Sequence, residues 1–375
     1  IFLYSILGLV LKILGFIKGQ RIKKNVKITS PSIILSNHTS FYDFVYTTAA
    51  VYPHRINYLA AHKFFYEPGL KFFLKIARAI PKFLFQTDPV ATKKAMRILN
   101  QGGIIGIMPE GQISPIGVSM EYNESVVKLV KKTKVAVYAV IHKNAYLVNP
   151  PWSKKTFKGK IETTVELIAS KEQVQILNDE ELNQLIKDKM YFNTHEYNET
   201  RKMQVKLNSI RNLESVIYRC PSCGDQNLYS DDHALHCPSC NATYVYDRFG
   251  RLGNYRLDKL YRLQEIEMKN IIDNNLFFVM KAEVRLETYR EQRIVDVGSG
   301  VLTLSRNGYH FEGEIEGNTR VFDFSLKQVP TLPTDLGLNI QIYDQYILYQ
   351  FVFDNIKIPT QFIIAGEYLH RMAIS

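Results

Sequence analysis

The sequence is short of several features that would each define a class of protein. Only 4 of its 375 residues are cysteine, and all lie between positions 220 and 240, so the rest of the chain has no thiol for a disulfide or a metal. No internal repeat or low-complexity segment stands out. The one long apolar stretch, residues 1–17, is interrupted by Lys12 and falls short of the about 20 residues that a membrane-spanning helix needs.

Acidic residues are scarce in one half of the chain. Residues 1–160 contain 24 Lys and Arg but 6 Asp and Glu, a net charge of +18, whereas the remaining residues carry −7, for a total of +11. This asymmetry indicates an anionic partner for the first half alone. An anionic bilayer surface or an acidic soluble partner would each be attracted by such a field.

The apolar segment from Ile1 to Ile17 is followed by five basic residues, at positions 18, 21, 23, 24 and 27. This arrangement favours a helix that lies in, or dips into, the membrane interface. A full membrane span stays open as the alternative. A cleaved signal peptide is not expected, because its basic residues would precede the apolar stretch.

The segment SNHTSFYDF places His38 and Asp43 five positions apart, directly after a short apolar run. Five residues of regular helix turn through about 500°, so the two side chains would point about 140° apart. They meet only if His38 lies in the turn before a helix, with an N-cap at Thr39 or Ser40 and the helix over 41–50. Asp43 then accepts the Nδ1 proton of His38 and leaves Nε2 free to take a proton from a substrate hydroxyl.

A second segment, MPEGQIS, places Glu110, Gly111 and Ser114 directly after the apolar run Ile104 to Met108. Both segments follow runs that predict buried strands, so we expect their side chains at strand ends. A His and an Asp at this spacing occur by chance in many chains, but the two segments in this order form a specific pattern.

The motif N-H-x4-D followed by P-E-G-x-x-S resembles the glycerolipid acyltransferase family, whose best-known members make phosphatidic acid from lysophosphatidic acid. The resemblance covers about residues 1–195. It implies that His38 is the general base, that Asp43 orients it, and that the acceptor hydroxyl attacks an acyl thioester directly. The donor would be acyl-CoA or an acyl-carrier protein. The substrate-binding residues that the resemblance implies are Asn37, Glu110, Gly111 and Ser114.

The sequence departs from the family where arginines are usual. Ile113 stands where the family usually has an arginine before the serine, and Lys82 follows the Ile-Pro pair of the intermediate motif. The later Val-Pro-Val-like element, 135–138, lacks its proline. Arginine binds phosphate through two parallel hydrogen bonds, whereas lysine acts as a point charge. We predict Lys82 as a replacement in the acceptor site, with an ordinary surface lysine as the alternative.

The four cysteines form two Cys-Pro-Ser-Cys pairs separated by thirteen residues. Paired thiolates at this spacing predict a tetrahedral structural zinc site with the ligands Cys220, Cys223, Cys237 and Cys240. Disulfides or a redox role stay open as alternatives. Residues 220–247 contain four Asp and no Lys or Arg, which disfavours nucleic-acid binding through this ribbon.

The fold class that these patterns predict is α/β: a three-layer acyltransferase domain with a mixed sheet, a small zinc ribbon and a small β-barrel-like domain. Strands are expected over 135–141 and 160–169, and a helix after Asn178. Helices over 199–218 and 258–274 are expected to flank the ribbon. The C-terminal pattern of short strands and a final helix resembles pleckstrin-homology-like and GRAM-type domains. The expected boundaries are 1–30 for the membrane-associated helix, 31–195 for the acyltransferase domain, 196–217 for a helical linker, 218–248 for the ribbon, 249–276 for a second helical linker and 277–375 for the β-rich domain.

The sequence thus predicts an O-acyltransferase of phospholipid biosynthesis, which moves a fatty acyl group to a hydroxyl of a glycerophospholipid precursor. The expected acceptor is 1-acylglycerol-3-phosphate, and the expected location is the cytoplasmic face of a membrane with anionic lipid, without a nucleic-acid partner. The competing interpretation is a catalytically silent lipid- or partner-binding scaffold. The missing arginines favour the scaffold, whereas the intact His38, Asp43, Glu110 and Gly111 argue against it.

Overall fold

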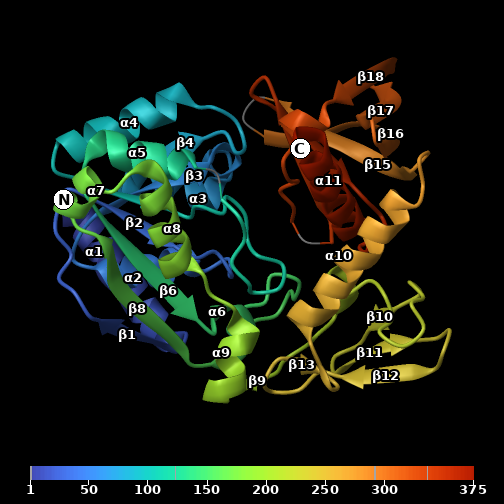
Figure 1. Cartoon of the computed structure of the whole chain (residues 1–375), viewed down its shortest axis with the longest axis horizontal. Coiled ribbons are helices and arrows are strands. Elements are labelled where there is room, and N and C mark those ends of the chain that lie inside the picture. Colours follow the sequence, from blue (N-terminus) through green and yellow to red (C-terminus); the bar gives the residue numbers. More distant parts are fainter. Residues whose placement is uncertain (1, 123, 291–292, 336) are drawn as a thin grey trace. The chain divides into compact units, whose positions relative to one another are not determined.

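The computed structural model describes residues 2–122, 124–290, 293–335 and 337–375 (Figure 1). Ile1, the first residue of the predicted apolar segment, lies outside them. The chain forms two compact units, each of which is discontinuous in sequence. Unit 1 comprises Ile1–Pro151, Lys155–Asn208 and Arg248–Gly250, and unit 2 comprises Trp152–Lys154, Ser209–Asp247 and Arg251–Ser375.

A seven-stranded sheet forms the middle of unit 1. Neighbouring strands are parallel except β6 and β8, which are antiparallel. In sheet order the strands are β1 (Gln20–Lys24), β8 (Ile161–Ala169), β6 (Ala136–Lys143), β2 (Ser32–Ser36), β5 (Ile104–Ile107), β3 (Ile56–Ala61) and β4 (Ile80–Lys82). The inner strands β2, β5 and β6 are almost wholly buried, as their apolar runs predict for strands covered on both faces.

Helices cover both faces of this sheet, which confirms the predicted α/β domain with a mixed sheet (Figure 1). On one face Leu99 of α4 and Val130 of α5 pack in one core with Ile33 of β2. On the other, Val51 of α2 packs in a second core with Ile34. The helices of unit 1 are α1 (Phe2–Ile17), α2 (Asp43–Val51), α3 (Pro68–Ala77), α4 (Pro89–Asn100), α5 (Ser125–Thr133), α6 (Ala145–Val148), α7 (Lys171–Ile176), α8 (Asp179–Met190) and α9 (Thr194–Arg201), with a 3₁₀ turn η1 (His62–Phe65) and a short pair of strands β7 (Lys158–Gly159) and β9 (Val205–Lys206).

The predicted N-terminal helix is present as α1, and two glycines fit it closely onto α2. A Cβ on Gly8 would lie 2.8 Å from the ring of Tyr52, and one on Gly15 would lie 3.5 Å from Ala49 Cβ. The rest of α1 exposes large apolar side chains. Within the described part of the chain, no helix combines the length and the apolar character that crossing a membrane requires.

Two sequence expectations about helices are wrong. Helix α2 begins at Asp43 rather than at 41, because side chains hold residues 39–42 in a turn: the Asp43 carboxylate accepts from the amides of Thr39 and Ser40, and the Ser40 hydroxyl accepts from the amide of Tyr42. The stretch 199–218 is not a helix: α9 ends at Arg201, where Lys202 takes a left-handed conformation, and the chain continues through β9 and the turn η2 (Leu213–Ser215). The predicted helix after Asn178 is correct, and a capping box of Asn178 and Glu181 starts it.

Unit 2 contains the cysteine ribbon and a larger antiparallel sheet. The ribbon strands are β10 (Tyr229–Ser230), β11 (Ala234–Cys237) and β12 (Ala242–Val245), followed by the hairpin β13 (Arg251–Leu252) and β14 (Tyr255–Arg256) and by helix α10 (Leu257–Asp273). The larger sheet has the order β18-β17-β16-β15-β20-β19. Its strands are β15 (Val279–Arg290), β16 (Arg293–Ser305), β17 (Gly308–Ile315), β18 (Asn318–Phe324), β19 (Asn339–Asp344) and β20 (Ile347–Val352), with the turn η3 (Leu326–Gln328) and the C-terminal helix α11 (Ile358–Ile374).

The C-terminal sheet corrects the expectation of a small barrel. Strands β18 and β19 are its two edges, and within the residues described they do not pair with each other, so no closed barrel forms. Helix α11, which the sequence predicts over 361–372, packs side chains such as Phe362 against Phe353, the residue that follows β20.

Candidate active site

His38 and Asp43 lie together at one edge of the sheet in unit 1. His38 follows β2, and Glu110 follows β5, the parallel neighbour of β2. The carboxyl ends of parallel neighbours share a sheet edge, which is where ligands of open α/β sheets bind. His38 Nδ1 lies 3.1 Å from Asp43 Oδ2. The structure therefore brings together the two residues that the sequence pairs as base and orienter.

The Asp43 carboxylate is buried and fixed from several directions. Its side chain is 0% exposed, whereas that of His38 is 19% exposed. Besides the His38 ring, Oδ2 accepts hydrogen bonds from the backbone amides of Thr39 (2.7 Å) and Ser40 (2.8 Å). An ionised carboxylate in this position accepts the proton on Nδ1, so Nε2 carries the free lone pair. The partly exposed imidazole is thereby set up to accept a proton from outside.

Glu110 ties the His38 turn to the loop that follows β5. One carboxylate oxygen accepts from the amide of His38 (3.3 Å) and the other from the amide of Met120 (3.1 Å). Burial raises the pKa of Glu110 to about 8, and the nearby Asp43 adds to this, although both amide hydrogen bonds oppose it. Both oxygens thus hold the backbone, and the acceptor-binding role that the sequence implies for Glu110 stays a prediction.

Ser114 and Gly111 shape the same loop. The amide of Ser114 donates to the carbonyl of His38 (2.7 Å), and its buried hydroxyl donates to the carbonyl of Val118 (2.7 Å). Gly111 has a φ of +73°, a left-handed conformation that favours glycine, and a Cβ there would lie 3.3 Å from the Phe85 ring. Both residues therefore position the backbone around His38, and substrate contacts for them stay predictions.

Asn37 is locked to a residue that the sequence did not single out, His142 at the end of β6. The Asn37 side-chain oxygen accepts from the His142 amide (2.9 Å), and its NH₂ group donates to the His142 carbonyl (3.5 Å). This two-way bond fixes the residue that precedes the base to the neighbouring parallel strand. Asn37 is fully buried, so the structure shows a supporting role for it.

The ring of His142 lies in a buried polar cluster beneath the His38 turn. Nε2 lies 2.7 Å from the Thr47 hydroxyl and 3.2 Å from that of Ser36, and Nδ1 lies 3.1 Å from that of Thr163. Burial lowers the pKa of His142 to about 4, so the ring is neutral at pH 7. Ser36 precedes the His38 motif and Thr47 lies in α2 after Asp43. The cluster therefore fixes the segments on both sides of the His38–Asp43 pair. The only sign of this role in the sequence is that His142 lies in a predicted apolar strand.

Lys82 does not occupy the position of a free cation. Its ammonium donates to the carbonyls of Phe83 and Gln86, each at 3.2 Å, next to the end of β4. Burial lowers the pKa of Lys82, which Asp88 opposes. Two carbonyls occupy two of the three N–H groups of the ammonium, so one N–H is left for a phosphate and the acceptor role of Lys82 stays a prediction.

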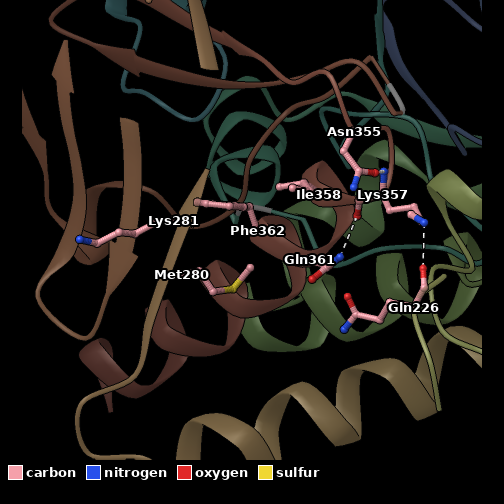
Figure 2. Close-up of a pocket in the computed structure, with 8 residues that line it drawn as sticks. All are labelled: Gln226, Met280, Lys281, Asn355, Lys357, Ile358, Gln361 and Phe362. Atoms are coloured by element: carbon pink, nitrogen blue, oxygen red, sulfur yellow. Dashed lines mark hydrogen bonds between the residues drawn. The ribbon is translucent and has the colours of Figure 1, made fainter. Parts of the chain in front are cut away.

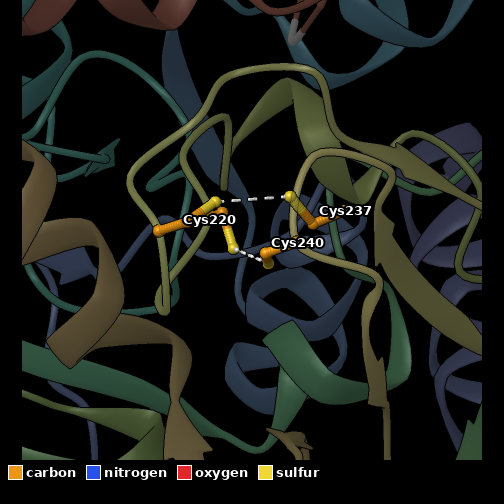
Figure 3. A group of neighbouring side chains, drawn as sticks. Cys220, Cys237 and Cys240 are labelled. Carbon is orange, nitrogen blue, oxygen red and sulfur yellow. Dashed lines mark hydrogen bonds between the residues drawn. The ribbon is translucent and has the colours of Figure 1, made fainter.

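The four cysteines of unit 2 converge to one cluster (Figure 3). All four sulfurs lie within 4.8 Å of one another, and the pairs 220–240 and 223–237 are 3.7 and 3.6 Å apart. Tetrahedral zinc with Zn–S bonds of about 2.3 Å separates its sulfurs by about 3.8 Å. The described cysteines form no disulfide. The cluster therefore fits a four-coordinate metal ion.

The turn between the two cysteine pairs is tied to the start of α11, also in unit 2. Lys357 Nζ donates to the carbonyls of Gln226 (2.8 Å) and Leu228 (3.3 Å). Next to Lys357 lies a pocket with a volume of about 320 Å³. Figure 2 shows residues that line it, among them Met280, Phe362 and Lys281. None of the predicted catalytic residues lines it.

The comparisons with known proteins concern the part of the chain that carries His38. The family model described as Acyltransferase matches residues 19–143, from β1 to the end of β6. The 1-acyl-sn-glycerol-3-phosphate acyltransferase of Bacillus subtilis (strain 168) is 27% identical over 110 residues, which are 29% of this chain. Residues 19–143 are thus similar to an acyltransferase domain.

The similar proteins match only part of this chain, and this chain matches only part of them. The chain spans about half the length of the curated relative, since the aligned part covers 55% of it. A solved structure, the 1-acyl-sn-glycerophosphate (LPA) acyltransferase PlsC from Thermotoga maritima, superimposes with a TM-score of 0.42 at 18% identity, over 52% of this chain and 79% of that one. The matched region includes every residue of the His38 site up to His142, whereas the cysteine ribbon and the C-terminal sheet lie outside it.

Proposed function

We propose that this protein is an O-acyltransferase that transfers a fatty acyl group from an acyl thioester to a hydroxyl of a lysophospholipid, with 1-acylglycerol-3-phosphate as the acceptor and phosphatidate as the product. The observation that carries the proposal is the His38–Asp43 pair, in which a buried and immobilised carboxylate holds a partly exposed imidazole in one orientation. The family match to acyltransferases and the name of the Bacillus subtilis relative support the reaction class and this acceptor.

In the proposed reaction, Nε2 of His38 takes the proton of the acceptor hydroxyl as its oxygen attacks the thioester carbonyl. A C–O bond forms and the C–S bond breaks, so the acyl group leaves the thiol carrier for the acceptor. The proton on the imidazolium then passes to the departing thiolate. Asp43 stabilises the imidazolium between the two steps, and no covalent enzyme intermediate is required.

The experiment is an acyl-transfer assay on the full chain with a panel of lysophospholipid acceptors and with acyl-CoA and acyl-carrier-protein donors. His38→Ala is expected to lower the rate by about 10²–10⁴-fold, the range typical of general-base removal. His310→Ala is the matched control, because His310 is a half-exposed histidine of unit 2 that pairs with Asp323. A folded His38→Ala protein that transfers acyl groups at the wild-type rate excludes this mechanism.

The same assay separates the proposal from the alternative of a silent lipid- or partner-binding scaffold. Turnover with any acceptor and donor, lost in His38→Ala, supports the enzyme. The scaffold predicts lipid binding without turnover over the whole panel. The feature that favours the scaffold is the replacement of the family's usual arginines by Lys82 and Ile113.

We further propose that the cysteine cluster holds a structural Zn²⁺ through Cys220, Cys223, Cys237 and Cys240. The support is the near-tetrahedral spacing of the four sulfurs. The ion would join the two cysteine turns of a ribbon whose strands are too short to be stable alone.

We place the protein at the cytoplasmic face of a membrane, attached through α1. The exposed apolar side chains of α1 and the net charge of +18 in residues 1–160 support this location. It brings the His38 site to a lysophospholipid, which partitions into the bilayer. Polar substitution of the exposed residues Ile6, Val10 and Ile13 tests it while leaving the contacts of Gly8 and Gly15 with α2 intact, and vesicle binding is expected to fall.

A further inference from the structure

Helix α3 exposes an aromatic pair on the surface of unit 1. Phe72 is 65% and Phe73 45% exposed, and their rings meet edge to face with centroids 6.0 Å apart. Helices of globular domains are usually held by an apolar face that packs on the core. None of the described side chains of α3 is fully buried, although Leu70, Leu74 and Ile76 are also apolar. Much of the apolar surface of this helix is thus left exposed within the described part of the chain.

The charge on and after α3 has one sign. Lys71, Lys75 and Arg78 are exposed, and residues 68–78 contain no Asp or Glu, although the exposed Glu67 directly precedes the helix. An anionic bilayer matches both features, because its interface accepts aromatic rings and its headgroups attract lysine. A second copy of the chain matches less well, since a two-fold interface places the same cations opposite each other. The charge therefore selects lipid over self-association.

Helix α1, which also exposes apolar side chains, is a neighbour of α3. The two helices are in contact, and Arg55, after α2, lies over the Tyr4 ring of α1. At the other end of α1, Lys18 lies 3.9 Å from the centre of the Tyr42 ring. Tyr42 adjoins Phe41, which is half exposed and lies three residues after His38. Exposed apolar and basic side chains thus occur on α3, on its neighbour α1 and next to the turn that carries His38.

We propose that α3 is a second membrane-contacting element, whose Phe72 and Phe73 enter the interface of an anionic bilayer while Lys71 and Lys75 contact lipid phosphates. The inference rests on the membrane attachment proposed above and adds to it, because a second contact with the bilayer at α3 would limit the rotation of unit 1 about the axis of α1. Entry of the acceptor from the bilayer to His38 is the expected benefit.

The first test places a fluorescent reporter on α3. The chain has one tryptophan, Trp152, which is buried and supplies a constant background. In Phe72→Trp, vesicles of phosphatidylcholine and phosphatidylglycerol are expected to shift the emission to the blue, and brominated acyl chains are expected to quench it. Ile176→Trp is the matched control, because Ile176 is also strongly exposed but lies on α7, which packs on the opposite face of the sheet.

The second test measures vesicle binding of paired substitutions. Phe72→Ser with Phe73→Ser is expected to weaken binding by about tenfold or more. Lys71→Ala with Lys75→Ala is expected to cost about fivefold for each lysine on anionic vesicles and nothing on neutral ones. The controls are Val90→Ser with Ile176→Ser, and Lys93→Ala with Lys94→Ala, all exposed on α4 or α7. They are expected to leave apolar and electrostatic binding close to wild type.

The outcomes separate this inference from the proposals on which it rests. If the α1 substitutions release the protein but the α3 substitutions do not, and Phe72→Trp is not quenched, α3 is not a membrane element while the attachment through α1 stands. Conversion of a dimer to a monomer by Phe72→Ser with Phe73→Ser, without quenching, overturns the inference in favour of a second copy. Acyl transfer to a water-soluble short-chain acceptor is expected to be unchanged by all α3 variants, so a failure here leaves the His38 mechanism untouched.

Discussion

Two substitutions of Asp43 separate its electrical from its structural role. Asp43→Asn keeps an oxygen that can accept from the amides of Thr39 and Ser40, but it removes the negative charge beside the His38 ring. Asp43→Ala removes the charge and the acceptor. A hydrogen bond to a charged group contributes about 1.5–3 kcal/mol, so we expect Asp43→Asn to lower the rate of acyl transfer by roughly 10- to 150-fold.

The stability of the two variants is expected to differ more than their activity. Thr39 and Ser40 are buried, and Asp43→Ala leaves both amides without their acceptor, at about 1–3 kcal/mol for each. The free energy of unfolding should therefore fall by about 2–6 kcal/mol in Asp43→Ala and by about 1 kcal/mol in Asp43→Asn. Urea unfolding and initial rates with acyl-CoA measure both quantities. A wild-type rate in Asp43→Asn, or equal destabilisation in the two variants, refutes this account of Asp43.

Three further predictions concern the supporting residues and the ribbon. His142→Leu is expected to lower the free energy of unfolding by about 2–4 kcal/mol, because three buried hydroxyls lose their hydrogen bonds to the imidazole ring. His142→Gln should recover part of this loss, and urea unfolding measures both variants. Burial raises the pKa of Glu110 from 4.5 to about 8, so between these pH values the folded state keeps a proton that the unfolded state releases. The contribution of Glu110 to the free energy of unfolding should therefore be full below pH 4.5 and be lost as the pH rises to about 8. Glu110→Gln should remove this pH dependence, which unfolding curves measured across the same range would show. The protein purified without added metal is expected to contain about one zinc per chain by elemental analysis, and Cys223→Ser should lower this content, whereas disulfides found by thiol counting contradict the site.

The parts of the fold that the sequence predicts well are those set by local patterns. The buried strands β2, β5 and β6 follow from short apolar runs, and α8 follows from a capping box. The closeness of His38 and Asp43 follows from the turn geometry that a separation of five residues demands. The convergence of the cysteines follows from the spacing of two identical turns.

The parts that the sequence does not predict depend on contacts between distant segments. The predicted start of α2 is two residues early, because the Asp43 carboxylate binds the amides of Thr39 and Ser40 and so holds the preceding residues in a turn. The role of His142 depends on hydroxyls from β2, α2 and β8, which only the sheet order brings together. Lys82 resembles a phosphate ligand in the motif, yet its own loop supplies the carbonyls that it binds. The substrate contacts of Asn37, Glu110, Gly111 and Ser114 stay predictions.

The discontinuity of the two units means that the chain cannot be divided by one cut. Unit 1 uses residues 248–250 from beyond the ribbon: the carbonyl of Arg248 accepts from the amide of Val205 (2.9 Å). Trp152 belongs to unit 2 although the residues on both sides of 152–154 belong to unit 1, and the centre of its ring lies 5.8 Å from that of Tyr246. A truncation after Asn208 therefore removes residues 248–250 from unit 1. It also removes Tyr246, so Trp152 loses the ring that it contacts. Because each unit includes a segment that lies within the other in sequence, cutting the chain at either boundary is expected to destabilise both units.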